Sequence, residues 1–436
     1  MLFETLRNGC IKGFAFCNIL KIYVLCGGVS KICYRAYVLI PENCKFFCNF
    51  AAEKIKRVIC FRTRFGYKPL TDMKKLFYLF CAAVVLAACN AKPSGESANP
   101  VDKILLKDFN PTVVNNIPVT QVDKAKFPII DMHSHDYVES AADIEQWCKN
   151  MDEVGVLHTA VMHCSWIGRP FEEVVELYAP YKDRFRFWCC FDYSDMSEEG
   201  IQKACQLLER YHNELGAVGI GELGDKGEGD LYARPVEGKD IHIDDPRIQP
   251  LIRKAGELKM PISIHIAEPY WMYLPMDATN DGLVNAVNWH VDTTNCYGYW
   301  KLVESFENAV RENPNTLFIA CHYLNMSHDW VRLGEMLDKY PNMYVDIAAR
   351  VAESAHTPRA TREFLIKYQD RVLFGTDNGY ELQMYRNIFR VLETNDEHFY
   401  IPEFGYHWAL SGFNLPDEVL KKIYHDNAER ILNEYK

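Results

Sequence analysis

The sequence predicts a closed, parallel (β/α)8 barrel over residues 125–436, and three observations carry this prediction. Short apolar runs alternate with amphipathic stretches through to the end of the chain. The runs are almost continuously apolar, as strands are in a parallel sheet covered on both faces. Eight such strand–helix units occupy about 310 residues, which favours a closed barrel over an open, doubly wound sheet.

Eight apolar runs are expected to form the strands of this barrel. In chain order they are residues 127–133, 157–164, 185–192, 217–223, 261–267, 317–323, 343–349 and 372–378. Between them, apolar residues recur at the spacing of one helix face. The clearest of these helical stretches are residues 172–182, 201–215, 248–259 and 300–313.

Residues 1–72 differ in composition from the rest of the chain. They carry 12 Lys/Arg against 4 Asp/Glu and contain seven of the 16 cysteines. Because they show no clear period or helix caps, we assign them no fold and expect them to be an upstream extension translated in error. A membrane-associated basic arm is the alternative, since residues 21–40 are apolar and basic, although they contain no uncharged span of about 18 residues.

Residues 73–89 have the layout of a secretory signal peptide. Two lysines precede an apolar run of about a dozen residues, and small residues lead up to Cys89. The run is too short for a transmembrane helix, and its lysines and the polar residues after it disfavour a buried core helix. The stretch LAAC, residues 86–89, resembles the lipobox of bacterial lipoproteins, in which the signal is cut before a cysteine that then carries lipid.

This resemblance implies an exported bacterial lipoprotein, anchored through lipid on Cys89 to the outer membrane or at the periplasmic face. Residues 90–124 are then a polar tether. Residues 90–436 hold 34 basic and 55 acidic residues, a net charge of −21, which argues against nucleic acid as a partner. The seven cysteines after Cys89 contain no C-x-x-C pair, so we expect buried thiols rather than a disulfide framework.

Two histidines end the first predicted strand, in the stretch FPIIDMHSHDY at residues 127–137. On an extended strand the side chains at positions i and i+2 point to the same side, so His133 and His135 can reach one point in space. This arrangement suits a metal ion. A hydrogen-bonded pair of histidines is the alternative that the motif alone leaves open.

Other predicted strands also end in polar side chains. The active site of a (β/α)8 barrel lies at the C-terminal ends of its strands. Strand four ends with Glu222, strand five with His265, strand six with His322 and strand eight with Asp377. Each residue alone has a structural explanation, such as helix capping or a satisfied core histidine. Together, four histidines and two carboxylates at one rim predict a metal site.

The order of these residues resembles the amidohydrolase superfamily of metal-dependent barrels. Residues 368–378, YQDRVLFGTDN, and 415–432, LPDEVLKKIYHDNAERIL, are similar to the last strand and closing helix of its amidohydrolase-related (amidohydrolase 2) branch, which also contains decarboxylases of the aminocarboxymuconate semialdehyde type. The resemblance covers roughly residues 125–434. It implies an enzyme that uses activated water to cleave a C–N or C–O bond of a small organic molecule, such as an amide, lactone or ester.

Two alternatives to hydrolysis stay open at this point. A metal-dependent decarboxylase or hydratase would use the same site, and release of carbon dioxide would distinguish a decarboxylase from a hydrolase. The other alternative is a non-catalytic surface lipoprotein that kept the barrel as a binding module. The complete set of candidate ligands argues against it.

The resemblance also implies a divalent cation, with zinc best suited to the nitrogen and carboxylate donors. Its ligands would be His133, His135, His265 and Asp377. Asp377 would in addition accept a proton from the attacking water. His322 would either bind a second ion or act as a general acid/base.

The number of ions depends on Glu222. Binuclear relatives bridge two ions with a glutamate or a carboxylated lysine near this strand, and mononuclear decarboxylase-like members generally lack this carboxylate. Lys226 lies too far along the chain to be the usual bridging lysine. We therefore expect one or two ions per chain, with Glu222 and His322 among the ligands if there are two.

Substrate specificity is predicted to lie in the long loop after His265. Residues 268–300 are dense in aromatics, and long loops after barrel strands usually form the substrate pocket. We expect Trp271 to contact substrate, while packing within the loop is the alternative. Similar aromatic candidates are Tyr270, Tyr273 and Trp289.

Three further residues are candidates for substrate binding. Arg350, just past strand seven, has a planar guanidinium that matches a substrate carboxylate, although a salt bridge to an acidic neighbour would explain it equally. His163 and Trp166 follow strand two and lie near the expected rim, without an assigned role.

Overall fold

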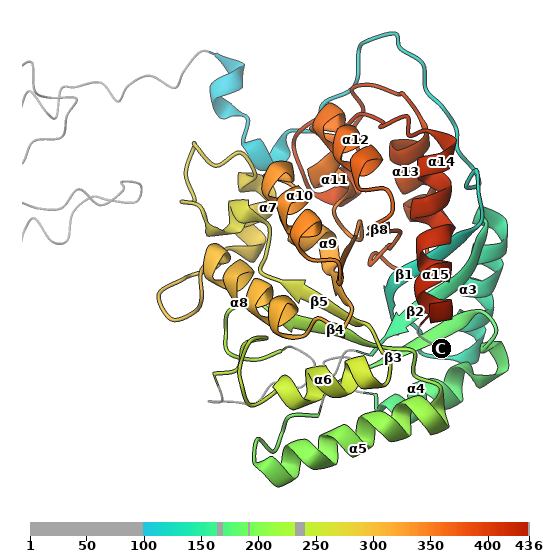
Figure 1. Cartoon of the computed structure of the whole chain (residues 1–436). Helices are drawn as coiled ribbons and strands as arrows, with labels where there is room; N and C mark the ends of the chain where they lie inside the picture. The colour runs from blue at the N-terminus through green and yellow to red at the C-terminus, as the bar shows by residue number, and fades with distance from the viewer. Residues whose placement is uncertain (1–98, 164–168, 191, 232–239, 435–436) are drawn as a thin grey trace, which may run out of the picture. The chain divides into compact units, whose positions relative to one another are not determined.

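The eight strands of this computed structural model form one parallel sheet that curves into a nearly closed barrel (Figure 1). The structure describes residues 99–163, 169–190, 192–231 and 240–434. Strand order follows the sequence and every neighbouring pair is parallel, as predicted. The strands are β1 Ile129–His135, β2 Val156–Met162, β3 Phe185–Cys189, β4 Gly219–Asp225, β5 Ile262–Ile266, β6 Phe318–Ala320, β7 Met343–Asp346 and β8 Val372–Leu373.

Backbone hydrogen bonds connect β1 to the segment that follows β8. The Met132 N–H donates to the Phe374 carbonyl at 2.9 Å, and the Thr376 N–H donates to the His133 carbonyl at 3.1 Å. Strand β8 is shorter than the predicted residues 372–378. Beyond Leu373 the chain is no longer a regular strand, although Thr376 still bonds to both neighbours, because its carbonyl accepts the Ala349 N–H at 3.1 Å past β7.

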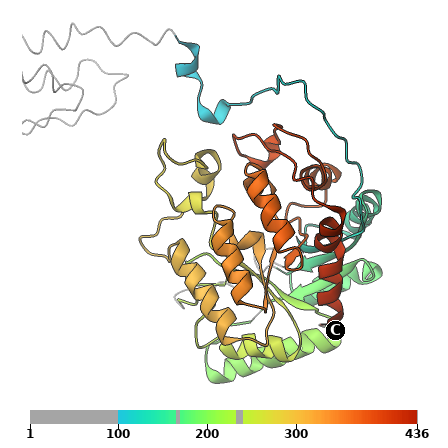
Figure 2. The same cartoon turned by 45° about the horizontal axis from the view of Figure 1, so that its top comes forward.

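Helices alternate with the strands and surround the barrel (Figures 1 and 2). None of those in the described ranges is both long enough and apolar enough to cross a membrane. The α-helices are α3 Ala141–Val154, α4 Phe171–Tyr178, α5 Glu198–Leu215, α6 Gln249–Glu257, α7 Leu283–Trp289, α8 Tyr299–Glu312, α9 Cys321–Leu324, α10 Trp330–Lys339, α11 Val351–Ala355, α12 Pro358–Lys367, α13 Leu382–Glu393, α14 Asp417–Lys421 and α15 Asn427–Glu434; α14 and α15 are joined by a π-helical turn, η9 Lys422–Asp426.

Helix α5 illustrates how the sequence specifies these elements. The Ser197 hydroxyl accepts the N–H of Gly200 at 3.0 Å and caps the first turn, where two glutamates complement the helix dipole. Gly216 ends the helix at a φ of 71°, a left-handed conformation that glycine adopts without strain. One face is buried at helical spacing, through Ile201, Ala204, Leu208 and Tyr211.

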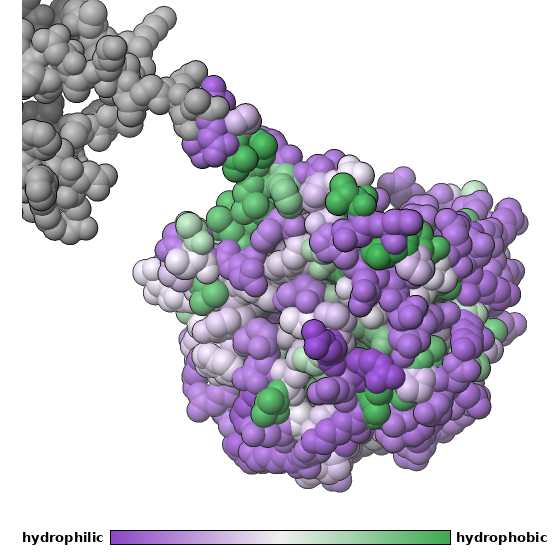
Figure 3. Space-filling model, turned by 90° about the horizontal axis from the view of Figure 1, so that it is seen from above, coloured by the Kyte–Doolittle hydropathy of each residue, from purple (hydrophilic) through white to green (hydrophobic). Residues whose placement is uncertain are grey.

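Two apolar clusters hold the barrel together. The larger one packs the outer faces of the strands against the surrounding helices. The smaller one joins several strands to α15 and includes Met132, Met162, Trp188 and Ile319. Seen from above, the described surface is mainly hydrophilic (Figure 3), and the exposed large hydrophobic residues lie mostly in residues 101–119.

The chain after β6 forms a left-handed turn, so the predicted strand 317–323 is wrong beyond Ala320. Four consecutive residues that are not glycine have positive φ, between 49° and 61°: His322, Tyr323, Leu324 and Asn325. Each L-residue in this conformation costs roughly 1–2 kcal/mol, so the surrounding contacts must compensate.

Several predicted features lie outside the described residues: the extension 1–72, the signal peptide 73–89 with Cys89, and Trp166. The predicted tether 90–124 is described from residue 99, where it forms two short 3-10 turns, η3 Pro100–Lys103 and η4 Leu106–Asp108. Its end is bound to the barrel, because the N–H and hydroxyl of Thr120 donate to the Asp396 carboxylate at 2.8 and 2.6 Å.

Candidate metal centre

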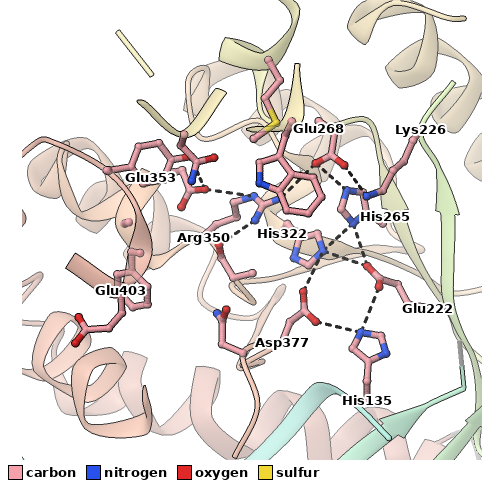
Figure 4. Close-up of a pocket in the computed structure, with 18 of the residues that line it drawn as sticks. His135, Glu222, Lys226, His265, Glu268, His322, Arg350, Glu353, Asp377 and Glu403 are labelled. Carbon is pink, nitrogen blue, oxygen red and sulfur yellow. Dashed lines mark hydrogen bonds and ion pairs between the residues drawn. The ribbon is translucent and has the colours of Figure 1, made fainter. Parts of the chain in front are cut away.

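The C-terminal ends of the strands bring together all six side chains predicted to form the metal site. Five of them line a cavity of about 710 Å³ (Figure 4). His133 is completely buried and does not line it. The five are His135, Glu222, His265, His322 and Asp377.

A first cluster joins the two histidines of β1 to the aspartate after β8. The His135 Nε2 lies 3.1 Å from the Asp377 Oδ1, and the His133 Nε2 lies 3.8 Å from the same oxygen. One donor atom from each of the three residues falls within 4.8 Å of the others, so this set can hold a metal ion.

A second cluster joins the histidines of β5 and β6. The His322 Nε2 lies 3.0 Å from the His265 Nδ1. The Glu222 Oε1 lies 3.1 Å from the first nitrogen and 3.2 Å from the second. These three donors therefore converge on a second point next to the first cluster.

Glu222 lies between the two clusters and turns one carboxylate oxygen toward each. Its Oε2 is 3.4 Å from the His135 Nε2, while its Oε1 faces His265 and His322. Its burial opposes ionisation, but the surrounding histidines, above all His133, outweigh this and hold the pKa of Glu222 well below its usual range. An ionised carboxylate with its two oxygens on different clusters has the arrangement of a bridging ligand.

Three of the histidines are oriented by hydrogen bonds from the ring nitrogen that faces away from the centre. A carbonyl oxygen can only accept, so Nδ1 carries the proton and Nε2 keeps its lone pair for the centre. The buried His133 Nε2 has no hydrogen-bond partner among the described residues, which fits a metal ligand. The Nδ1 acceptors are the Asp346 Oδ2 for His133 at 2.9 Å, the Met162 carbonyl for His135 at 3.3 Å and the Ala348 carbonyl for His322 at 2.8 Å.

Asp346, at the end of β7, was not identified from the sequence. It is fully buried, and besides holding His133 it accepts the His322 N–H at 2.8 Å through its other oxygen. One carboxylate therefore positions a residue of each cluster. The signal for it was present, because Asp346 interrupts an apolar run as Glu222 does.

Glu268, just past β5, was also missed. Its carboxylate lies 3.6 Å from the His265 Nε2, 2.5 Å from the Lys226 Nζ and 4.0 Å from the Arg350 Nη2 (Figure 4). Glu268 therefore lies beside the outer nitrogen of His265 at an ion-pair distance, without a hydrogen bond to it. Lys226 pairs with this glutamate, in agreement with the expectation that it is not the bridging lysine.

Arg350 lines the cavity and also contacts acidic neighbours. Besides Glu268, its Nε lies 3.7 Å from the Glu353 Oε1. The same Nε donates to the Asn325 Oδ1 at 2.7 Å. The sequence offered two interpretations of Arg350, substrate binding and a salt bridge. The structure is compatible with both, because Arg350 lines the cavity and also pairs with acidic side chains.

Two of the other predicted substrate contacts, His163 and Trp271, do not line the cavity. The His163 Nε2 donates to the Arg169 carbonyl at 2.7 Å, and His163 is not among the cavity's lining residues. Trp271 is 8% exposed and packs against Trp408, with ring centroids 5.6 Å apart, so it supports the wall rather than forming it. From the same loop, Trp289 does line the cavity.

The protonation of the site follows from burial and charge. Burial, together with the Arg350 guanidinium, lowers the pKa of His322, which leaves its imidazole neutral near neutral pH. Despite its burial, Asp377 has its pKa lowered by His133 and His135 and is ionised. Neutral imidazoles and ionised carboxylates are the forms that bind metal. His322 is shifted towards that form, whereas the pKa of His133 is raised despite its burial, above all by the Asp346 carboxylate, so a bound cation would have to displace a proton there.

Comparison with known proteins gives a family match over most of the barrel. The family model described as "Amidohydrolase" matches residues 130–433. No curated protein matches the chain in sequence.

Similar solved structures include an uncharacterized TIM-barrel protein of Bordetella bronchiseptica, with 16% identity, a TM-score of 0.46 and coverage of 71% of this chain and 99% of that one. A 2,6-dihydroxybenzoate decarboxylase has 15% identity, a TM-score of 0.43 and coverage of 71% and 100%. An amidohydrolase of Burkholderia multivorans with bound zinc has 10% identity, a TM-score of 0.42 and coverage of 70% and 99%. Because the family model spans the barrel from its first strand to its last helix, the chain belongs to the amidohydrolase family.

Proposed function

We propose that the chain is a metal-dependent hydrolase that uses activated water to cleave a C–N or C–O bond of a small amide, lactone or ester. The observation that carries this proposal is the convergence of four histidines and two carboxylates, five of which line one cavity. The cavity volume of about 710 Å³ suits a small organic molecule. Divalent zinc, in one or two ions, is the cation best matched to these donors.

A bound divalent cation supplies a Lewis acid that lowers the pKa of a water molecule and polarises the substrate oxygen. Asp377 then accepts a proton from the attacking water. Its side chain is 22% exposed, against 9% for Glu222, so it is the more accessible carboxylate of the pair. As the water oxygen bonds to the substrate carbon and the C–N or C–O bond breaks, Asp377 returns the proton to the leaving group.

Binding of the rest of the substrate falls to the outer part of the cavity. Arg350 offers a guanidinium there for a carboxylate or a developing negative charge, and Trp289 offers an aromatic surface. His322, neutral and fixed by its Nδ1 hydrogen bond, acts as second-ion ligand or as a general acid/base whose Nε2 lone pair first takes the proton that it later donates.

Product analysis tests the reaction class. The zinc-loaded protein, incubated with a panel of small amides, lactones and esters in isotopically labelled water, is expected to place one labelled oxygen in the acid product. Protein treated with a chelator should be inactive and should recover activity when zinc is restored, because the cation activates the water. Release of carbon dioxide without incorporation of label would identify a decarboxylase and overturn the hydrolase proposal.

We also propose that the enzyme is exported and held at the bacterial outer membrane or at the periplasmic face by lipid on Cys89. Support comes from the lysines, the apolar run and the LAAC stretch of residues 73–89, and from Asn90 after the cysteine, which in many bacteria is compatible with the outer membrane. One lipid-modified end and a polar tether would let the barrel stand off a surface.

Expression in bacteria from Met73 is expected to give a membrane-bound protein whose first residue is lipid-modified Cys89. Cys89→Ser removes the acceptor sulfur, so the protein should leave the membrane fraction; Cys296→Ser, in the barrel, is the control and should stay membrane-bound. Mass spectrometry of the purified N-terminus is the measurement. An unprocessed N-terminus at Met73, or a Cys89→Ser protein that stays in the membrane fraction, would contradict the proposal.

A further inference from the structure

The left-handed turn after β6 begins at His322, the residue of the second cluster that contacts both His265 and Glu222. Four successive L-residues in this conformation are strongly disfavoured, since only glycine adopts it freely. The direction of the His322 ring therefore depends on whatever holds the turn in place.

Two hydrogen bonds lie within the turn itself. The Asn325 N–H donates to the His322 carbonyl at 2.8 Å, and the Met326 N–H donates to the Tyr323 carbonyl at 3.0 Å. Such bonds form in any tight turn and do not select the left-handed form. The selection must come from contacts with the rest of the barrel.

Two of these contacts hold His322 itself, whose N–H donates to Asp346 and whose Nδ1 donates to the Ala348 carbonyl, both at 2.8 Å; the Asn325 side chain makes the others. Its Nδ2 donates to the carbonyls of Ile266 and Ala267, at 3.1 and 3.0 Å, directly past β5. Its Oδ1 accepts from the Arg350 Nε at 2.7 Å, past β7. One amide, 2% exposed, thus links the turn to the strand ends on both sides of β6.

Arg350 is held firmly enough to serve as the other half of this link. Its Nη1 donates to the Ala349 carbonyl at 2.9 Å, and the carboxylates of Glu353 and Glu268 lie 3.7 and 4.0 Å from its Nε and Nη2. The rigid guanidinium can direct Nε at Asn325 while Nη2 points elsewhere. A lysine ammonium in its place cannot do both.

We propose that Asn325 and Arg350 are positioning residues that lock the left-handed turn and so aim the His322 imidazole at Glu222. Neither residue has to touch the reacting atoms to do this. The inference rests on the proposed function in one respect, the use of His322 at the metal centre. It assigns Arg350 a role that is independent of substrate recognition.

Replacing Asn325 with glycine distinguishes two explanations for this residue: the hydrogen bonds of its side chain, and the ease with which asparagine adopts a positive φ. Asparagine is among the residues that accept positive φ most readily, so Asn325 would need no further explanation if backbone tolerance were its only role. In that case Asn325→Gly would be harmless or even stabilising. If the side-chain link matters, the same substitution removes it while relieving the backbone strain.

The test compares the zinc affinity of Asn325→Gly with that of the wild-type protein, by competition with a chromophoric chelator, and turnover once a substrate is in hand. His322→Ala serves as the reference. Asn414→Gly is the matched control, because Asn414 also has positive φ, 46°, but is exposed and remote from the centre. If His322→Ala weakens zinc binding, we expect Asn325→Gly to weaken zinc binding by about tenfold or more; if His322→Ala lowers turnover, Asn325→Gly should lower turnover to a similar degree. Asn414→Gly should change neither zinc affinity nor turnover.

Arg350→Lys is the second variant and keeps the positive charge at the cavity. It should reproduce the Asn325→Gly defect, and the double variant should be no worse than either single one, because both changes break one link. The inference would be overturned if His322→Ala lowered zinc affinity or turnover while Asn325→Gly kept the wild-type value of that same quantity. An Arg350→Lys effect confined to KM would also overturn it. If His322→Ala changes neither quantity, the proposed use of His322 is itself wrong.

Discussion

Replacing Asp377 with alanine is expected to remove both the bound metal and the activity. Asp377 supplies carboxylate oxygens to the first cluster, with Oδ1 3.1 Å from the His135 Nε2, and it is also the proposed proton acceptor. His133→Ala should behave alike, because it deletes a fully buried imidazole whose Nε2 has no other partner in the described structure. We expect activity to fall by roughly a thousandfold or more in both variants.

Elemental analysis of protein purified from zinc-replete cells, together with the activity assay, measures this result. Asp396→Ala is the control, since Asp396 is a buried, paired aspartate whose partners are Arg390 and Thr120 rather than the centre. This control should lose stability but keep its zinc. Wild-type protein that contains no metal after growth in zinc-replete medium would contradict the proposal that the chain is a metal-dependent hydrolase.

Glu222→Gln is expected to lose one of two bound zinc ions. The two Glu222 oxygens face different clusters, 3.4 Å from the His135 Nε2 and 3.1 Å from the His322 Nε2. A neutral amide has only one acceptor oxygen and cannot supply anionic charge to both clusters. His322→Ala should also lose one equivalent, because it removes a ligand of the second cluster alone.

A single-ion centre would give a different pattern. Glu222 would then act only on neighbouring ligands or substrate, and His322 would serve as proton donor. Both variants would retain one full equivalent of zinc, with Glu222→Gln changed in rate or specificity and His322→Ala inactive. Metal stoichiometry measured in the two purified variants distinguishes these cases, and unchanged single occupancy in both excludes the bridge.

Predictions from the sequence were most reliable where a local pattern has one structural meaning. Near-continuous apolar runs predicted all eight strands, because a parallel barrel strand is covered on both faces. The His-x-His pair and the polar strand ends predicted which six side chains would meet, because a barrel gathers the C-terminal ends of its strands at one rim.

Predictions were weaker where the outcome depends on partners distant in the chain. The β8 segment was expected to continue as a strand to residue 378, but it ends at Leu373, and Thr376 beyond it bonds to both His133 and Ala349, which lie elsewhere in the chain. The left-handed turn at His322 was not predicted, since its four residues carry no glycine and only Asn325 is a type that accepts positive φ readily. Trp271 was chosen for its aromatic ring, yet packing against Trp408 decided its place.

By itself the sequence determined the barrel, its family and the six side chains that meet at the candidate metal centre, because each depends on residue type and spacing along one strand or helix. Only the tertiary structure decided how those donors are held: Asp346 behind His133, Glu268 behind His265, and Asn325 beneath the turn that carries His322. These supporting residues come from other strands, and their choice of partner is a matter of distance in space. A buried carboxylate or amide needs hydrogen-bond partners, but the sequence of the chain does not say which partners the fold will bring within reach.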